Sequence, residues 1–215
     1  MIHQTTLRQL AALKLNRRPL VICDVDEVVV HFTRDFEAFL EDRGLWLDTV
    51  SLALNGNIRR RDTQAPIEAH GVATLIDNFF AERTLHMQPI DGAIESLLKI
   101  GEVADVVMLT NLPHEAGDDR RANLAGHGLP YPVVTNSGPK GPAIVQLAAT
   151  TKAPVVFVDD SPAFINSAFE HAPHVHLVHF MHDERFARHV APIDFVSLRT
   201  GTWTEARPHV LALID

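Results

Sequence analysis

Cysteine is almost absent from this chain: Cys23 is the only one in 215 residues. A single cysteine excludes an internal disulfide and is typical of a reducing compartment, so we expect a cytoplasmic protein. Basic residues are also few, because 19 Lys and Arg stand against 27 Asp and Glu, for a formal net charge of −8. This balance argues against nucleic-acid binding through a basic face.

Long hydrophobic runs are missing as well. No stretch approaches the roughly 18 apolar residues of a membrane span, so we expect no membrane partner. In the first 18 residues, leucines recur among polar residues, which predicts a short amphipathic helix rather than the apolar core of a signal peptide. With 46% hydrophobic and 21% charged residues, the composition is that of a globular protein. The length suits one domain with an insertion, and the oligomeric state stays open.

The most informative segment present is residues 21–30. A run of β-branched residues, typical of a buried strand, leads into Asp24 and Asp26. In a parallel α/β sheet, ligands bind at the carboxyl ends of strands. Two neighbouring carboxylates there repel each other unless a cation or a shared proton relieves them, and Mg²⁺ is a cation that does so. The alternative is an ordinary strand-to-turn junction, where Asp is also common.

Polar residues occupy similar positions later in the chain. Two of these groups directly follow hydrophobic runs, and one lysine stands just before an apolar helical stretch. The three groups are Thr110-Asn111, Asp159-Asp160 and Lys140.

This ordered set (two alternating aspartates, a threonine, a lysine and an aspartate pair) resembles the four motifs of the haloacid dehalogenase superfamily of phosphohydrolases. The resemblance spans residues 20 to about 180. It implies an α/β fold, with a Rossmann-like parallel sheet covered by helices on both faces and a small, mostly helical cap.

Alternating strand and helix patterns independently favour a parallel sheet with right-handed crossovers. The predicted strands are 20–25, 104–109, 132–135, 154–158 and 175–178, and the predicted core helices are 90–101, 115–127, 140–150 and 161–171.

One connection, residues 31–88, is far longer than the dozen or so residues that a crossover needs. Apolar residues recur at helical spacing near both of its ends: Phe32, Phe36, Phe39 and Leu40, then Ala73, Leu75, Ile76, Phe79 and Phe80. The resemblance implies that this segment is a cap inserted after the first motif, with residues 1–30 and 89–215 forming the core. The segment 111–138 is too short to hold a second cap.

The resemblance also implies catalytic roles. Asp24 would be the nucleophile that becomes a phosphoaspartate, and Asp26 the general acid and then the base. Thr110 and the backbone N–H of Asn111 would bind a phosphate oxygen. Lys140 would offset charge between the nucleophile and the phosphoryl group.

A Mg²⁺ site is implied at the same place. Asp24, the backbone carbonyl of Asp26 and Asp160 would be ligands, with Asp159 either a further ligand or orienting water or Lys140. Two positions depart from the pattern: Glu27 stands where many relatives have glycine, and Phe164 stands where a further acid is often found.

The sequence therefore predicts a Mg²⁺-dependent phosphohydrolase for a small phosphate ester. Two alternatives stay open, a phosphotransferase or mutase of the same fold and a binding or regulatory protein without turnover. Five histidines gather around the last predicted strand: His171, His174, His176, His179 and His182. A transition-metal site involving His174 and His176 is conceivable, but their spacing fits no zinc pattern and structural roles are favoured.

Overall fold

The computed structural model describes residues 2–215, and its centre is a six-stranded parallel sheet. The strand order is β5-β4-β1-β6-β7-β8. In chain order, the strands are β1 (Leu20–Cys23), β4 (Asp105–Thr110), β5 (Val133–Thr135), β6 (Val155–Asp159), β7 (His176–Phe180) and β8 (Leu198–Thr200). The predicted α/β fold with a parallel sheet is confirmed.

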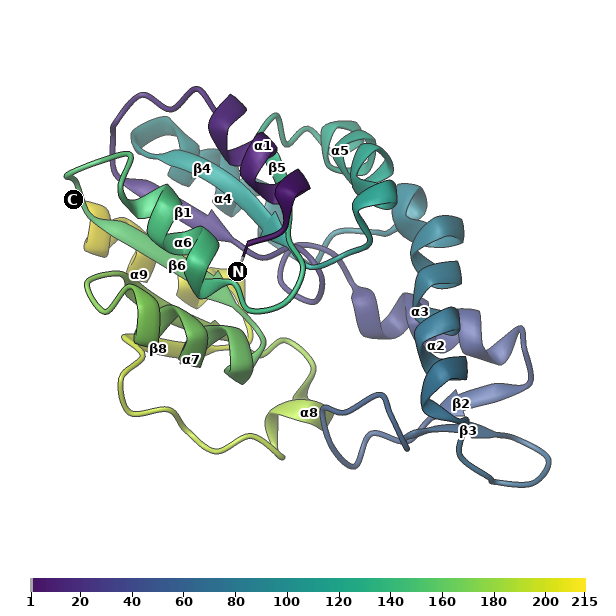
Figure 1. Cartoon of the computed structure of the whole chain (residues 1–215). Helices are drawn as coiled ribbons and strands as arrows, with labels where there is room; N and C mark the ends of the chain where they lie inside the picture. Colours follow the sequence, from purple (N-terminus) through teal and green to yellow (C-terminus); the bar gives the residue numbers. More distant parts are fainter. Residues whose placement is uncertain (1) are drawn as a thin grey trace.

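Helices cover both faces of the sheet (Figure 1). On one face lie α1 (Gln4–Ala12), α6 (Gly141–Ala148) and α7 (Pro162–His171), and on the other α4 (Ala93–Val103) and α9 (Trp203–Ile214). Strand β1 contributes side chains to the apolar cores on both faces of the sheet, because successive side chains of a strand point to opposite faces. Val21 and Cys23 join one core, and Leu20 and Ile22 join the other. Helix α5 (Gly117–Gly126) packs beside β5, after the short helix η2 (His114–Ala116).

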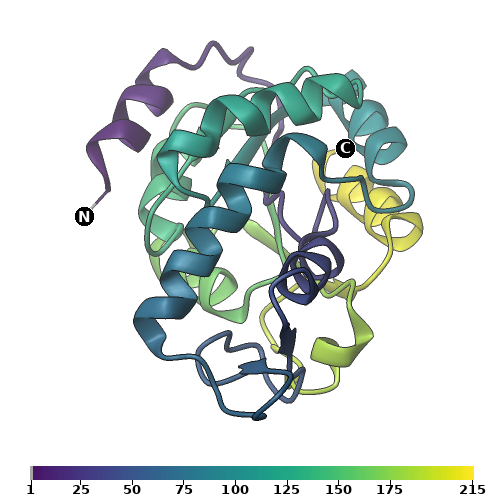
Figure 2. The same ribbon diagram turned by 90° about the vertical axis from the view of Figure 1, so that its right-hand side faces the viewer.

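Between β1 and α4 the chain leaves the sheet for a separate layer, which we call the insertion (residues 31–88). It contains α2 (Phe32–Glu41), α3 (Ala69–Arg83), the short helix η1 (Thr84–His86) and an antiparallel hairpin of β2 (Leu45–Leu47) and β3 (Ile58–Arg60). Figure 2 shows the insertion face-on, in front of the sheet. The two expected helices form, although Ala73 of the expected apolar face is exposed and Val72 is buried instead.

The two ends of the insertion meet at one point on the core. The backbone N–H of His31 donates to the carbonyl of Gln88 at 3.0 Å, and Val30 forms a β-bridge with Pro89. The two segments that connect the insertion to the core therefore lie side by side. Such paired connections suit a hinge between the insertion and the core.

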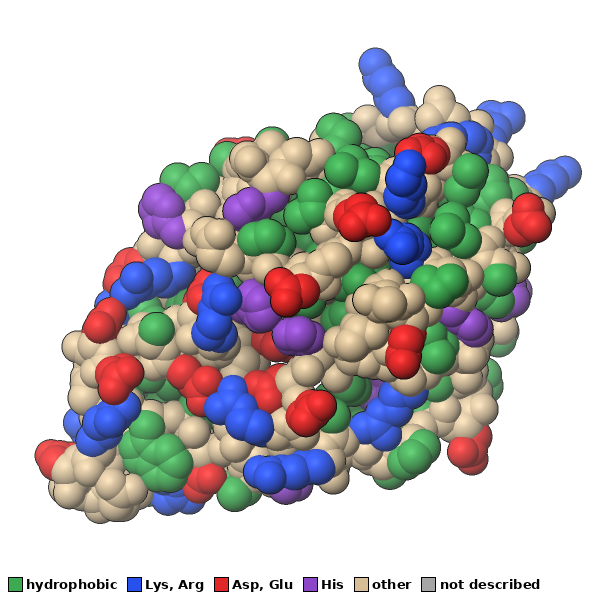
Figure 3. All heavy atoms as spheres, turned by 180° about the vertical axis from the view of Figure 1, so that it is seen from behind, with side chains coloured by type: hydrophobic (Ala, Val, Ile, Leu, Met, Phe, Trp, Pro, Cys, Tyr) green, Lys and Arg blue, Asp and Glu red, His purple; other side chains and the backbone are tan. Residues whose placement is uncertain are grey.

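Among the elements not anticipated from the sequence are β2, β3, the short helix α8 (Glu184–Ala187), β8 and α9. Helix α9 carries Pro208 within it, which interrupts the pattern of a regular helix. The expected N-terminal helix is found as α1, while Met1 lies outside the described residues. Across residues 2–215, no helix is both long and apolar enough to cross a bilayer. Lys and Arg side chains are interspersed with Asp and Glu over the face seen in Figure 3.

An aromatic cluster holds the insertion together, with Phe79 at its centre. Phe79 is fully buried and packs edge-on against Phe32, Phe36 and Phe39, with ring centroids 5.3, 5.2 and 5.5 Å away. We expect Phe79→Ala to lower the free energy of unfolding by about 3–5 kcal/mol, because it removes a ring and leaves a cavity. Denaturant titration measures this. Leu85→Ala, at a residue that is 45% exposed, is the control and should change it by less than about 0.5 kcal/mol. Equal effects of the two substitutions would contradict this account of the cluster.

Candidate active site

The loop that follows β1 places two aspartates at the carboxyl edge of the sheet. The backbone N–H groups of Val28, Val29 and Val30 all donate to the carbonyl of Val25, which closes a tight turn. Glu27 within it adopts a left-handed conformation, with φ of 60°. For a residue other than glycine this costs roughly 1–2 kcal/mol, so the surrounding contacts must hold the turn in place.

One of those contacts comes from the far end of the chain. The indole N–H of Trp203, at the start of α9, donates to the carbonyl of Val28 at 2.8 Å. Trp203 is almost completely buried. The loop that carries the aspartates is therefore fastened to the helix layer beneath it.

Asp24 lies against a buried lysine. The Nζ atom of Lys140 is 2.7 Å from Asp24 Oδ1 and 2.6 Å from Asp159 Oδ2, and its side chain is fully buried. Both contacts are ion pairs, and Lys140 Nζ also donates a hydrogen bond to Asp159 Oδ2. Lys140 thus stands between two carboxylates, as the predicted role in offsetting charge requires.

Close packing of two helices fixes the position of Lys140. The lysine caps the N-terminus of α6, and the next residue, Gly141, donates its N–H to the hydroxyl of Ser167 in α7. A Cβ atom at Gly141 would lie 2.2 Å from the Ser167 carbonyl oxygen, so only glycine fits there. Upstream, Gly138 turns the chain with φ of 79°.

Burial dominates the electrostatics of this group. It raises the pKa of Asp24 from 3.8 to about 7, against the lowering influence of Lys140. It also raises the pKa of Asp159 and, with help from Asp159 and Asp24, that of Asp160. Burial alone would lower the pKa of Lys140, but Asp159 and Asp24 outweigh it and raise that pKa. The site therefore holds more negative charge than its own lysine relieves.

These residues fit a hard divalent cation. Carboxylate oxygens of Asp24, Asp159 and Asp160 lie within 4.8 Å of one another, and such oxygens are the ligands that Mg²⁺ prefers. The carboxylate of Asp26 is not part of the cluster. This agrees with the expectation that Asp26 would bind the metal through its backbone carbonyl and not through its side chain.

Asp26 instead faces the opposite side of the site. Its carboxylate accepts hydrogen bonds from Arg120 Nη2 at 2.5 Å and from the Thr110 hydroxyl at 3.1 Å. Arg120, on α5, is completely buried, and its Nε and Nη1 atoms have no partner in the described chain. Sequence reasoning missed Arg120, because its neighbour Arg121 is an ordinary exposed arginine and nothing in the local pattern separates the two.

Thr110 and Asn111, the predicted phosphate-binding pair, end β4 beside Asp26. The side-chain amide of Asn111 donates to the carbonyl of Gly138 at 2.8 Å and accepts from Asn136 at 2.9 Å. Asn111 therefore ties the end of β4 to the segment that leads to Lys140. This engages its side chain and leaves the predicted phosphate contact to its backbone N–H.

One histidine near the last predicted strand supports the aspartate pair. His179 is buried, and its Nε2 atom donates to the backbone carbonyl of Asp160 at 2.9 Å. His174 and His176 are exposed, and neither belongs to a potential metal cluster within residues 2–215. The structural reading favoured for these histidines agrees with this arrangement.

A cavity of about 160 Å³ opens beside Asp160, between the core and the insertion. Phe32, Leu47 and Leu54 of the insertion form part of its wall, and Met181 contributes from the core. A small organic group could be enclosed there next to the acidic cluster.

Known proteins resemble this chain in fold rather than in sequence. No family model matches it, and no curated protein matches it. Among solved structures, a candidate HAD-hydrolase (haloacid dehalogenase-type), YfnB from Bacillus subtilis bound to magnesium, superposes with a TM-score of 0.61 at 14% identity, covering 91% of this chain and 99% of its own. A HAD family hydrolase from Deinococcus radiodurans with bound phosphate and sodium gives 0.56 at 15% identity, covering 92% and 96%. A candidate β-phosphoglucomutase from Bacteroides vulgatus gives 0.55 at 12% identity, covering 99% and 97%.

The α/β core implied by the motif resemblance is thereby confirmed: the chain has the fold of haloacid dehalogenase-like hydrolases. At these identities the comparisons establish the fold, and the roles of individual residues rest on the geometry described above.

The raised pKa of Asp24 predicts how the metal-free protein responds to pH. The folded state retains a proton on Asp24 up to about pH 7, whereas the unfolded chain loses it near 3.8, so stability is greatest below the lower value and falls as pH rises toward the higher one. We expect the melting temperature in EDTA to drop by several degrees between pH 5 and pH 8. Mg²⁺ should restore more of it at pH 8 than at pH 5.

The control is Asp24→Asn, which removes one of the three raised carboxylates and should flatten this dependence without abolishing it. A melting temperature in EDTA that stays level from pH 5 to pH 8 in the parent protein would contradict the raised pKa of Asp24.

Proposed function

We propose that this chain, with its haloacid dehalogenase-like fold, is a Mg²⁺-dependent phosphohydrolase that acts on a small phosphate monoester through a phosphoaspartate. The observation that carries the proposal is the buried carboxylate of Asp24, which pairs with Lys140 and lies beside the carboxylates of Asp159 and Asp160. Structures of the same fold that hold magnesium or phosphate support this choice.

In the proposed first step, an Asp24 oxygen attacks phosphorus, the bond from phosphorus to the ester oxygen breaks, and the departing alcohol receives a proton from Asp26. In the second step, Asp26 takes a proton from water, which attacks the phosphorus, releases phosphate and restores Asp24. Lys140 balances charge on Asp24 throughout. Mg²⁺ held by Asp24 and Asp160 would neutralise charge on the phosphoryl oxygens.

Arg120 and Thr110 have a positioning role in this scheme, because both hold the carboxyl group of Asp26. Asp26 must reach both the leaving oxygen and the attacking water. Its two anchors restrict the positions it samples, which is what general acid–base catalysis needs.

We also propose that the insertion acts as the cap. It supplies apolar walls to the cavity beside Asp160, and its two ends meet at the His31–Gln88 contact. Movement about that contact would admit the substrate, and closure would exclude water from the phosphoryl group.

Two other functions are weighed against hydrolysis. A phosphotransferase or mutase would use the same site with an alcohol in place of water, and the fold likeness to a candidate β-phosphoglucomutase keeps this alternative in view. A binding protein without turnover would have no use for Asp26 and its two anchors. Phosphate release from p-nitrophenyl phosphate, with and without added sugars or alcohols as acceptors, separates the three.

The metal requirement gives the first functional prediction. Phosphate release should stop in EDTA and return on addition of excess Mg²⁺, because uncompensated negative charge at Asp24, Asp159 and Asp160 repels the substrate. The assay follows p-nitrophenol by absorbance. Full activity after exhaustive chelation would contradict the metal-dependent mechanism.

The different roles proposed for Asp24 and Asp26 give the second functional prediction. Asp24→Asn should abolish turnover and labelling by phosphate together, because an amide is a poor nucleophile. Asp26→Asn should lower kcat/KM on an alkyl phosphate by roughly 10²–10⁴-fold, and by much less on p-nitrophenyl phosphate, whose leaving group needs little protonation. An equal loss on both substrates, or substantial activity in Asp24→Asn, would show that the assigned roles are wrong.

A further inference from the structure

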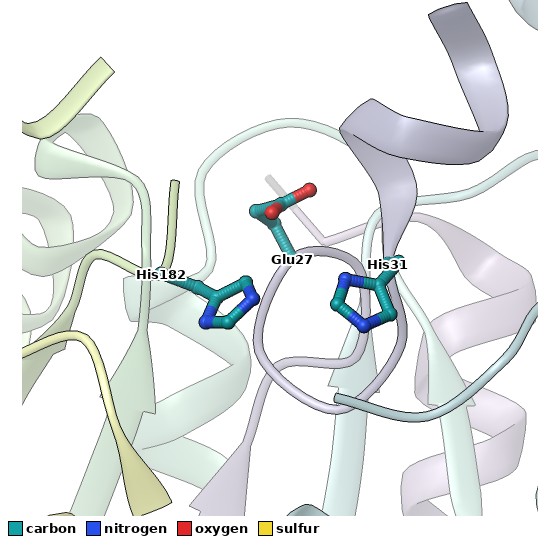
Figure 4. A group of neighbouring side chains, drawn as sticks. All are labelled: Glu27, His31 and His182. Atoms are coloured by element: carbon teal, nitrogen blue, oxygen red, sulfur yellow. The ribbon is translucent and has the colours of Figure 1, made fainter. Parts of the chain in front are cut away.

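A second group of potential metal ligands lies beside the acidic cluster and is not used by the proposed reaction. Glu27 of the loop after β1, His31 at the start of α2 and His182 just after β7 place ligand atoms within 4.8 Å of one another. Figure 4 shows the two imidazole rings on either side of the loop and the Glu27 carboxylate above them. Glu27 and His31 both lie in the loop between β1 and α2, and the fold brings His182, which follows β7, next to them.

The hydrogen bonding of His182 is that of a metal ligand. Its Nδ1 atom is 3.1 Å from the carbonyl oxygen of Gly201 and must donate there, because a carbonyl only accepts. In the neutral ring this leaves Nε2 with a free lone pair. Histidines that bind metals almost always donate their other ring N–H to a carbonyl or carboxylate in this way, which fixes the tautomer and the ring orientation.

Glu27 is held in place by its backbone and by one of its oxygens. Oε2 accepts from the backbone N–H of Thr33 at 2.6 Å, which fixes the position of the carboxylate. The residue is buried and left-handed, at a position where glycine would avoid the cost. A carboxylate in this strained backbone position suggests that the side chain of Glu27 has a function.

The donor set selects the class of ion. Two imidazoles and one carboxylate suit Zn²⁺ and neighbouring transition metals, whereas Mg²⁺ prefers oxygen ligands alone. In a tetrahedral zinc site with bonds near 2.0–2.1 Å, donor atoms lie about 3.4 Å apart. The rings of His31 and His182 have centroids 5.2 Å apart, so small side-chain rotations bring their nitrogens to that separation.

The site also has room for a further ligand. Glu27 and His182 both line the 160 Å³ cavity between the core and the insertion. From behind, histidine and acidic side chains gather around a hollow in this part of the surface (Figure 3). Three protein ligands and an open position toward a cavity are the arrangement of a zinc site that keeps a water.

We propose that Glu27, His31 and His182 bind one transition-metal ion of the Zn²⁺ class, separate from the Mg²⁺ site. Because His31 is the first residue of the insertion and the other two ligands belong to the core, the ion fastens the insertion to the core at its hinge. Occupancy of this site would therefore hold the insertion in one orientation over the cavity.

Zn²⁺ titration by calorimetry, in excess Mg²⁺ to occupy the acidic cluster, tests the site directly. We expect one Zn²⁺ per chain at micromolar or lower concentration, and a loss of affinity of about 100-fold or more in His31→Ala/His182→Ala. His176→Ala, which removes an exposed histidine on β7, is the matched control and should bind as the parent does. Co²⁺ in place of Zn²⁺ adds a visible spectrum that reports nitrogen ligation and should vanish in the double variant only.

The outcomes separate this site from the proposed catalysis. Asp24→Asn should still bind one Zn²⁺ while losing turnover, so the site can stand even if the phosphohydrolase assignment falls. The proposal is overturned if the parent protein takes up no Zn²⁺ below about 100 µM (a Kd corresponding to about −5.5 kcal/mol). It is equally overturned if the folded double variant, checked by circular dichroism, binds Zn²⁺ as tightly as the His176→Ala control.

Discussion

The rest of the site depends on one buried ion pair, in which Lys140 lies between Asp24 and Asp159. Taking each of these charges out of water costs several kcal/mol, and their mutual attraction offsets that cost only while all three are in place. With Asp160 included, three carboxylates face one ammonium, which leaves two negative charges when all are ionised. A divalent cation would balance these two charges.

The sheet brings these residues together before any side chain is considered. Strand β1 pairs with β4 on one side and β6 on the other, with Cys23 level with Met108 and Val158. The residues that follow these strands therefore meet at one edge. Aspartates that are far apart in sequence can therefore share a cation. For the same reason, each of these motifs directly follows a strand.

That geometry explains what sequence could predict. The parallel sheet, its strands β1, β4, β5, β6 and β7, and the flanking helices follow from hydrophobic periodicity, and the structure has them. The meeting of Asp24, Lys140 and Asp159 follows from parallel strand ends together with the family resemblance. The proposed roles of these residues in catalysis remain predictions.

Other features depend on contacts that no local pattern reveals. Arg120 is an arginine in a polar helix, and only the packing of α5 against Met87 and the loop after β1 buries it beside Asp26. His182 and Glu27 look unrelated in sequence because β4, β5, β6 and β7 lie between them in the chain. Strand β8 reads Leu-Arg-Thr and so lacks an apolar run, and α9 contains Pro208, so neither shows the pattern that identified the other strands and helices.

The contact between Trp203 and Val28 has a consequence for the order of folding. The loop that holds Asp24 and Asp26 is among the first parts of the core to be synthesised, yet its anchor lies 175 residues later. Until α9 has docked, the strained turn at Glu27 lacks the hydrogen bond that fastens it. Strands β1, β4, β5, β6 and β7 are therefore synthesised before the anchor of the site, and a nascent chain lacking α9 would carry the motif residues without that anchor.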